Sequence, residues 1–236
     1  MTARSVGVVL ALGATLATAP PASGAESSIG VGLALSSDLP DPVSGDYARF
    51  GPGPSLQIPV RVGLAPAANV RATVRADLGT GSDRVTWEQS AGGETHRFYD
   101  DDHFAALVAA GATVGPELVF PTSGAVKPTL GAEVGVAWVG TYHALSGPTA
   151  ILVDPSQNDV NSEGNIDPYS SQAVFLTDVH GGILTEGTVG FFAELGYSMA
   201  YLGASELKKT PPALKAQREA YGWNAARVGV GVLFAL

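Results

Sequence analysis

The sequence predicts an all-β protein, and specifically an eight-stranded antiparallel up-and-down transmembrane β-barrel. Eight segments alternate apolar residues with small or polar ones, as strands do because successive side chains point to opposite faces. The connections between these segments are short and long in turn. The last segment, residues 226–236, ends the chain, and a closed barrel allows such a strand to pair on both of its edges.

Composition limits the function. The chain has 236 residues, of which 30 are Gly and none is Cys, and its formal net charge is -9. Without cysteine there is no disulfide framework, thiolate nucleophile or Cys-ligated metal. A nucleic-acid partner is not expected, because binding to phosphates depends on clustered Lys and Arg.

The first 25 residues have the order of a signal peptide. Arg4 precedes a short apolar run at residues 6–18, and the small residues 22–25 follow, so we expect cleavage after Ala25. The apolar run is shorter than the roughly 20 residues of a membrane-spanning helix. We therefore assign residues 1–25 to a signal peptide and residues 26–236 to the barrel.

The eight predicted strands differ in strength, and the sixth alternates least clearly. They lie at residues 28–36, 56–64, 70–78, 104–118, 127–142, 173–184, 189–201 and 226–236. Short turns are expected at 65–69, 119–126 and 185–188, and long polar loops at 37–55, 79–103, 143–172 and 202–221. An even strand number then places both termini on the short-turn side, which is the periplasmic side. The second loop contains a predicted hairpin at 85–89 and 94–98, and the fourth a short helix at 213–220.

The second face of the strands is mostly Gly, Ala, Ser and Thr with isolated charges, which suits the narrow lumen of an eight-stranded barrel. Because unpaired buried charges are costly, we expect these charges to form a paired lumen network. Its predicted members are Arg61, Arg71, Arg75, Asp77, Glu117, Lys127, Glu133, Asp178, Glu194 and Arg227. A soluble lipocalin-like ligand-binding barrel is the alternative, but its outer face would carry abundant Lys, Glu and Gln.

Four aromatic residues lie toward the loop ends of the apolar faces, where an aromatic girdle is expected at a membrane interface. They are Trp138, Tyr142, Tyr197 and Tyr201.

In this pattern the mature chain resembles the small eight-stranded outer-membrane β-barrel proteins of Gram-negative bacteria, the group that includes the outer membrane protein A transmembrane domain. Members typically end in an aromatic residue that the barrel assembly machinery recognises. Here Phe234 lies two residues before the terminal Leu236, and we assign both to the assembly signal. The resemblance implies export to the cell outer membrane, with outer-membrane lipids, lipopolysaccharide and the assembly machinery as partners. It implies no particular activity, since members include anchors, adhesins, small pores and enzymes.

Two places could hold reactive groups. Asp100, Asp101, Asp102 and His103 could bind a hard cation or form an acid–base pair, but a solvated acidic loop end is the favoured interpretation. His143 and Ser146 lie near the expected outer rim. The lipid A deacylases of the related group have a His and a Ser two residues apart, and the spacing of three here does not match.

Two long loops carry charged side chains. Seven oxygen-bearing residues of the third loop could bind calcium, but they do not match the EF-hand template and also suit a polar loop. They are Asp154, Asn158, Asp159, Asn161, Glu163, Asn165 and Asp167. Four cations of the fourth loop could contact lipopolysaccharide phosphates or neighbouring acidic loops. They are Lys208, Lys209, Lys215 and Arg218.

The sequence thus favours a monomeric structural or interaction barrel with a lumen filled by side chains. A narrow pore for small solutes is the second hypothesis, because the lumen is rich in glycine. No enzyme activity, cofactor or metal is predicted.

Overall fold

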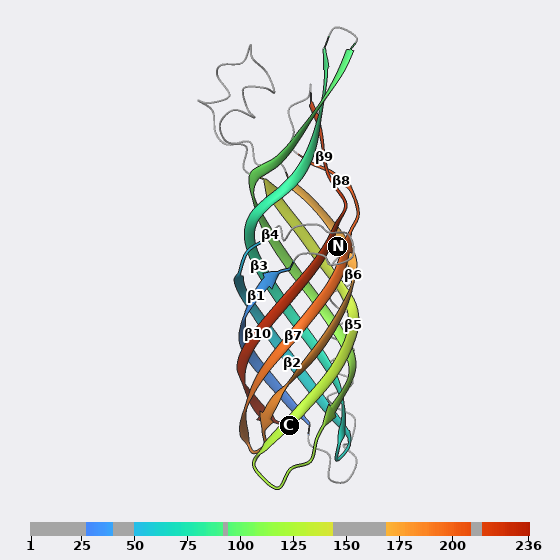
Figure 1. Cartoon of the computed structure of the whole chain (residues 1–236). Coiled ribbons are helices and arrows are strands. Elements are labelled where there is room, and N and C mark those ends of the chain that lie inside the picture. Colours follow the sequence, from blue (N-terminus) through green and yellow to red (C-terminus); the bar gives the residue numbers. More distant parts are fainter. Residues whose placement is uncertain (1–26, 40–49, 92–93, 144–168, 209–213) are drawn as a thin grey trace.

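The computed structural model describes residues 27–39, 50–91, 94–143, 169–208 and 214–236, and its strands wind into a barrel (Figure 1). The predicted signal peptide lies outside these residues. The eight barrel strands are β1 (Ser28–Asp38), β2 (Gly53–Ala65), β3 (Ala68–Ala91), β4 (Glu94–Val119), β5 (Val126–His143), β6 (Tyr169–Thr185), β7 (Val189–Leu202) and β10 (Tyr221–Ala235). Within the described ranges, no helix is long and apolar enough to cross a membrane.

The eight strands close into a ring in which every pairing is antiparallel. Their order is β1-β2-β3-β4-β5-β6-β7-β10, and β10 pairs with β1 to complete it. The terminal strand therefore pairs on both edges, from Ser28↔Ala235 to Asp38↔Ala225 on one side and along β7 on the other. The predicted fold class is confirmed. The weakly alternating sixth segment is also a complete strand, paired with both β5 and β7.

The two faces of the ring differ as the alternation predicts. Large apolar side chains lie exposed on the outside, among them Leu33 at 67% and Leu195 at 65% exposure. Charged side chains such as Arg71 and Glu117 are buried inside. This is the reverse of a soluble barrel, in which the apolar face is inside and the polar face meets water.

The short connections also follow the prediction, whereas the long loops predicted at 37–55 and 143–172 lie largely outside the described residues. The short turns between strands are residues 66–67, 120–125 and 186–188. β3 and β4 continue as a paired hairpin well beyond the ring, through Trp87↔Phe98 to Ala91↔Glu94, and Figure 1 shows this hairpin rising from the barrel. The hairpin predicted at 85–89 and 94–98 is confirmed, and most of the connection predicted at 79–103 is strand rather than loop.

The helix predicted at residues 213–220 is wrong. Leu214–Arg218 forms the strand β9, which pairs antiparallel with the extension of β3, from Gln89↔Leu214 to Val85↔Arg218. The two-residue strand β8 (Ser205–Glu206) then pairs with β9. The edge of β3 above the ring offers unpaired backbone groups, and a β ladder satisfies them where a helix would not. The projecting sheet therefore has the order β4-β3-β9-β8.

The lumen contains an apolar layer that the alternation pattern did not indicate. Toward the loop end, buried apolar side chains from β4, β5, β6, β7 and β10 meet inside the ring, together with Phe50. Leu107, Leu176 and Trp223 are three of the larger side chains in this layer. A second, smaller apolar cluster of Leu184, Phe192 and Leu233 lies toward the turn end. We call the first group the upper apolar layer and the second the lower apolar cluster.

Candidate functional site: the charged lumen

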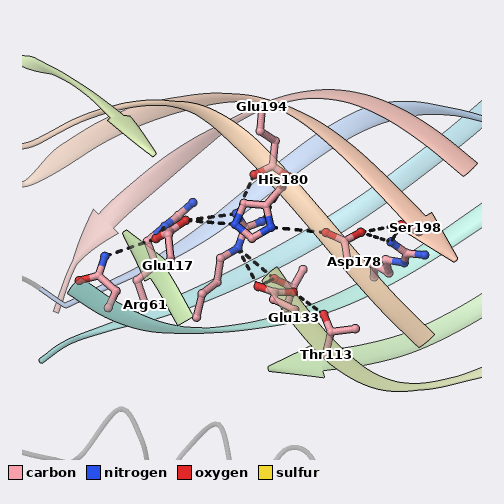
Figure 2. Close-up of polar contacts among 12 residues, drawn as sticks. Arg61, Thr113, Glu117, Glu133, Asp178, His180, Glu194 and Ser198 are labelled. Carbon is pink, nitrogen blue, oxygen red and sulfur yellow. Dashed lines mark hydrogen bonds and ion pairs between the residues drawn. The ribbon is translucent and has the colours of Figure 1, made fainter. Parts of the chain in front are cut away.

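Between the two apolar clusters, the lumen is occupied by a network of buried ion pairs (Figure 2). Alternation explains how the network is assembled, because residues two apart on a strand point to the same face. Arg71, Thr73, Arg75 and Asp77 all point inward from β3 and are all buried.

Arg71 is the centre of the network. Its Nη1 lies 2.8 Å from Glu194 Oε2 and 3.3 Å from Glu117 Oε1, and its Nε lies 3.2 Å from Glu133 Oε1. One guanidinium therefore joins carboxylates from β4, β5 and β7. Hydroxyls complete the shell, since Thr73 and Thr113 both donate to Glu133.

Toward the turn end, Arg61 and Glu117 form the next contact. Arg61 Nε donates to Glu117 Oε2 at 2.7 Å, and Asn69 Nδ2 donates to the same oxygen at 3.3 Å. The Arg61 guanidinium also lies 5.5 Å from the centre of the Phe192 ring, a cation–π distance. Arg61 thus joins the ion-pair network to the lower apolar cluster.

Toward the loop end, Asp178 on β6 forms ion pairs with two arginines. Arg75 Nη1 and Arg227 Nη1 each lie 3.0 Å from Asp178 Oδ2, and Ser198 donates to that oxygen. The Arg75 guanidinium lies 5.6 Å from the Trp223 ring, which belongs to the upper apolar layer. The upper face of the network is therefore in contact with that layer.

His180 is a member of this network that the sequence analysis did not assign. Its Nδ1 lies 3.4 Å from Asp178 Oδ1 and its Nε2 lies 3.6 Å from Glu117 Oε1 (Figure 2). The signal was available, because the alternation places His180 on the same face as Asp178. The imidazole links the upper and lower parts of the network.

The structure brings together all the predicted network residues except Lys127, each of them buried in the lumen. Lys127 lies near the start of β5, where it pairs with Glu186 of the following turn, and its side chain is 22% exposed. The prediction for Lys127 is wrong because alternation gives the face on which a residue lies but not its position along the barrel axis. Lys127 faces inward only at the very end of the barrel.

The four predicted girdle residues face away from the lumen in varying degree. Tyr142 and Tyr201 are exposed, whereas Trp138 and Tyr197 are partly buried by their neighbours. Tyr142 also stacks on Tyr169 of β6, with ring centres 6.0 Å apart. The proposed assembly signal, Phe234 and Leu236, is exposed at the turn end of β10.

The remaining candidates are divided between described and undescribed residues. His143 is buried in the loop-side mouth, where its Nε2 lies 3.2 Å from Thr141 Oγ1, and its intended partner Ser146 lies outside the described residues. Asp100, Asp101, Asp102 and His103 belong to β4, but their side chains are not described. All seven oxygen-bearing residues of the third loop also lie outside the described residues.

The four loop cations do not form one surface. Lys208 and Lys215 are exposed, and Lys208 lies 5.7 Å from the Tyr169 ring, whereas Lys209 lies outside the described residues. Arg218 is buried and donates to Ser170 Oγ at 3.3 Å and to the Gly203 carbonyl at 2.7 Å. Arg218 is thus a structural residue of the mouth, and the expectation that it lies on the surface is wrong.

The network can hold the walls of the barrel together and obstruct the lumen, but its donors and acceptors largely satisfy one another. Among the residues that the structure describes, no group of three or more His, Asp or Glu side chains is arranged to hold a metal ion. The chemistry that this site offers is therefore charge pairing between strands.

No protein family model matches the chain, and no curated protein matches it in sequence. Solved structures are similar to it in fold. Neisserial surface protein A is 14% identical with a TM-score of 0.44, covering 90% of this chain and 97% of its own. Ail, the attachment invasion locus protein of Yersinia pestis, is 13% identical with a TM-score of 0.44, covering 89% and 99%. A major outer membrane protein from Thermus thermophilus is 9% identical with a TM-score of 0.41, covering 89% and 99%.

The strand pairing described above establishes the fold independently of these likenesses. The chain is an eight-stranded antiparallel barrel, as the sequence predicts.

Proposed function

We propose that the protein is a monomeric bacterial outer-membrane barrel with a closed lumen, which serves as a structural and interaction element of the cell envelope. The observation that carries this proposal is the filling of the lumen. The lower apolar cluster, the ion-pair network and the upper apolar layer follow one another along the barrel axis.

The outer surface supports a position in lipid. Exposed Leu, Val and Phe side chains cover the strands around the ring, and in water this surface would favour aggregation. In a bilayer the same side chains contact acyl chains, and each strand of the ring pairs with a neighbour on both of its edges. The soluble lipocalin-like alternative would require an apolar interior, whereas the charged groups here are inside.

The closed lumen argues against the narrow pore. A solute passing through the barrel would have to displace Arg71 from three carboxylates and then pass Leu107, Leu176 and Trp223. Breaking buried ion pairs by removing one partner is costly, so the network is expected to remain in place.

The interaction role rests on the projecting sheet. β3 and β4 extend beyond the ring, and β9 and β8 widen this extension to four strands. Arg218 ties β9 to the mouth through Ser170 and Gly203. A sheet held in this way presents a defined surface outside the membrane, whereas lipids, lipopolysaccharide and the barrel assembly machinery are the partners we propose for the barrel itself.

Reconstitution into planar lipid bilayers tests this function. The purified mature chain, folded in detergent and shown to migrate differently on gels with and without boiling, is added to the bilayer. We expect incorporation without steady ion conductance. Stable single-channel steps from the wild-type protein would overturn the closed barrel in favour of the pore. Recovery of the protein only from the soluble periplasmic fraction would overturn the membrane location.

A further inference from the structure

His180 of β6 lies in the middle of the ion-pair network, with a carboxylate beside each of its two ring nitrogens (Figure 2). Nδ1 lies 3.4 Å from Asp178 Oδ1, and Nε2 lies 3.6 Å from Glu117 Oε1. Neither contact has the geometry of a hydrogen bond, so the charge of the ring determines whether the two contacts are favourable. A neutral imidazole would present a lone pair to one carboxylate, whereas an imidazolium carries an N–H on both nitrogens.

The charges of the lumen balance only when His180 is counted as a cation. Among the described residues, the buried network contains four arginines and five carboxylates. They are Arg61, Arg71, Arg75 and Arg227, and Asp77, Glu117, Glu133, Asp178 and Glu194. Asp38 and Arg218 are also buried, but they lie at the loop-side mouth and are one of each sign. An imidazolium at residue 180 therefore makes the positive and negative charges of the network equal in number.

Groups from the other strands that face His180 make its surroundings negative. Glu133 of β5 and Glu194 of β7 attract a positive ring, as the two contacting carboxylates do. Arg71 of β3 repels it, but Arg71 is itself paired with three carboxylates. Because an uncompensated buried charge is costly, a neutral ring would leave the network with one carboxylate too many.

The neighbouring strand leaves room for the ring at this position. Gly131 of β5 is the register partner of His180, and a Cβ at Gly131 would overlap His180 Nε2. The imidazole therefore lies against the backbone of β5, and a larger residue at position 131 would displace it from Glu117.

We propose that His180 is a buried proton-binding site, whose imidazolium is the fifth cation of the lumen and joins Asp178 of the upper network to Glu117 of the lower. Loss of this proton leaves an excess negative charge among the buried carboxylates and weakens the barrel. In the unfolded chain, a histidine releases its proton near about pH 6.5. Above that pH the folded chain holds a proton that the unfolded chain does not, so a rise in pH favours unfolding. This inference holds whether or not the barrel conducts.

Nuclear magnetic resonance of the ring nitrogens tests the protonation state directly. The mature chain, labelled with ¹⁵N-histidine and folded in detergent micelles, is measured at about pH 7, where a free histidine is mostly neutral. We expect both ring nitrogens of His180 to be protonated, and a ring that is mostly neutral would overturn the proposal. His180→Gln identifies the signal by its loss. If this variant does not fold, changing His96, His103 and His143 to Gln leaves His180 as the only imidazole of the chain.

Urea unfolding in lipid vesicles tests the consequence for stability. Between about pH 7 and pH 8, the unfolding equilibrium constant of the wild type should rise up to about tenfold more than that of His180→Gln, because unfolding releases one proton. His143→Gln, a buried histidine in the mouth, is the matched control and should keep the wild-type pH dependence. Identical pH dependence in the wild type and in His180→Gln would contradict the proposal. Loss of the pH dependence in His143→Gln alone would assign the proton to the mouth and contradict it as well.

Discussion

Arg71 on β3 and Glu194 on β7 form a two-pronged ion pair across the diameter of the barrel. Nη1 lies 2.8 Å from Oε2, and Nη2 lies 3.2 Å from Oε1. β3 and β7 are four strands apart in the eight-stranded ring and therefore form opposite walls. A single pair of side chains spans the lumen, as expected for a barrel whose interior is just wide enough to be filled by side chains.

The first prediction is that Arg71→Ala strongly destabilises the barrel. The change removes the cation that Glu117, Glu133 and Glu194 share. Breaking a buried ion pair in this way costs about 3–5 kcal/mol. The free energy of unfolding, measured by urea titration in lipid vesicles, should fall by that amount. Lys208→Ala is the control because Lys208 is exposed outside the ring. Equal unfolding midpoints for the two variants would contradict a structural role for Arg71.

A second substitution in the Arg71→Ala variant separates the effect of lost charge pairing from the effect of lost packing. In Arg71→Ala, a second change of Glu133→Gln should restore part of the lost stability, because Arg71 is the cation that pairs with Glu133 and the change removes the buried charge left uncompensated. No recovery in the double variant would mean that the loss comes from the lost volume of the arginine side chain.

The faces of the strands could be predicted from the sequence, but the heights of the side chains could not. Alternation places Arg71 and Arg75 on one face of β3, and both are inside. It does not reveal that Arg71 meets Glu194 while Arg75 meets Asp178, because that depends on the stagger between strands in the closed ring. For the same reason, Lys127 was expected in the network although it lies at the end of the barrel.

Two further features depended on closure of the ring. Leu107 shares a strand face with Gly111 and Thr113, so its position in the lumen follows from alternation, but the apolar layer appears only when several such residues reach the same height. The strand β9 was expected to be helical because local sequence favoured a helix. The exposed edge of β3 determined its conformation instead, an effect of tertiary context on propensity.

The second prediction concerns the glycines that make room for the network. A Cβ at Gly196 would lie 2.6 Å from Arg227 Nη2, and this guanidinium is held by Asp178. Gly196→Ala should therefore lower the unfolding free energy by about 1–3 kcal/mol, the usual cost of overpacking. Gly181→Ala is the matched control, since its Cβ would meet Thr129 O at an ordinary 3.6 Å. A loss as large at residue 181 would argue against a specific role of Arg227.

The third prediction tests the lipid-facing surface. Leu195, in the middle of β7, and Val189, at its turn-side end, are both exposed on the outside of the ring. Arginine on the lipid face of a barrel costs about 2–4 kcal/mol near the midplane and about 0–1 kcal/mol near the interfaces. In lipid vesicles, Leu195→Arg should thus be clearly more destabilising than Val189→Arg. Equal tolerance of both changes would show that this surface does not contact acyl chains.

The fourth prediction concerns the projecting sheet. Arg218 fastens β9 to Ser170 of β6 and to Gly203, so Arg218→Ala should loosen β9 from the mouth of the barrel. Limited proteolysis should then cleave the projecting sheet faster than in the wild type, while the protease-resistant barrel core remains. Lys215→Ala, an exposed position on the same strand, is the control. Unchanged cleavage in Arg218→Ala would mean that β9 is held by its pairing with β3 alone.

The last prediction follows from the order of the layers inside the lumen. If the ion-pair network were the only obstruction, Arg75→Ala would open a path for ions past Asp178. The Arg75 guanidinium, however, lies 5.6 Å from the Trp223 ring of the upper apolar layer, and Arg71 with its three carboxylates and the lower apolar cluster fill the lumen below it. We therefore expect no bilayer conductance from Arg75→Ala, from Trp223→Ala or from the double variant.

Each single variant is the control for the double one, provided that all three retain the gel mobility of a folded barrel. Conductance from Arg75→Ala alone would mean that the network is the effective barrier and that the apolar layer admits hydrated ions. Conductance from Trp223→Ala alone would mean that the apolar layer is the effective barrier and that hydrated ions pass the network. Conductance from the double variant alone would mean that Arg71 and the lower apolar cluster, which neither change disturbs directly, do not block the passage of ions.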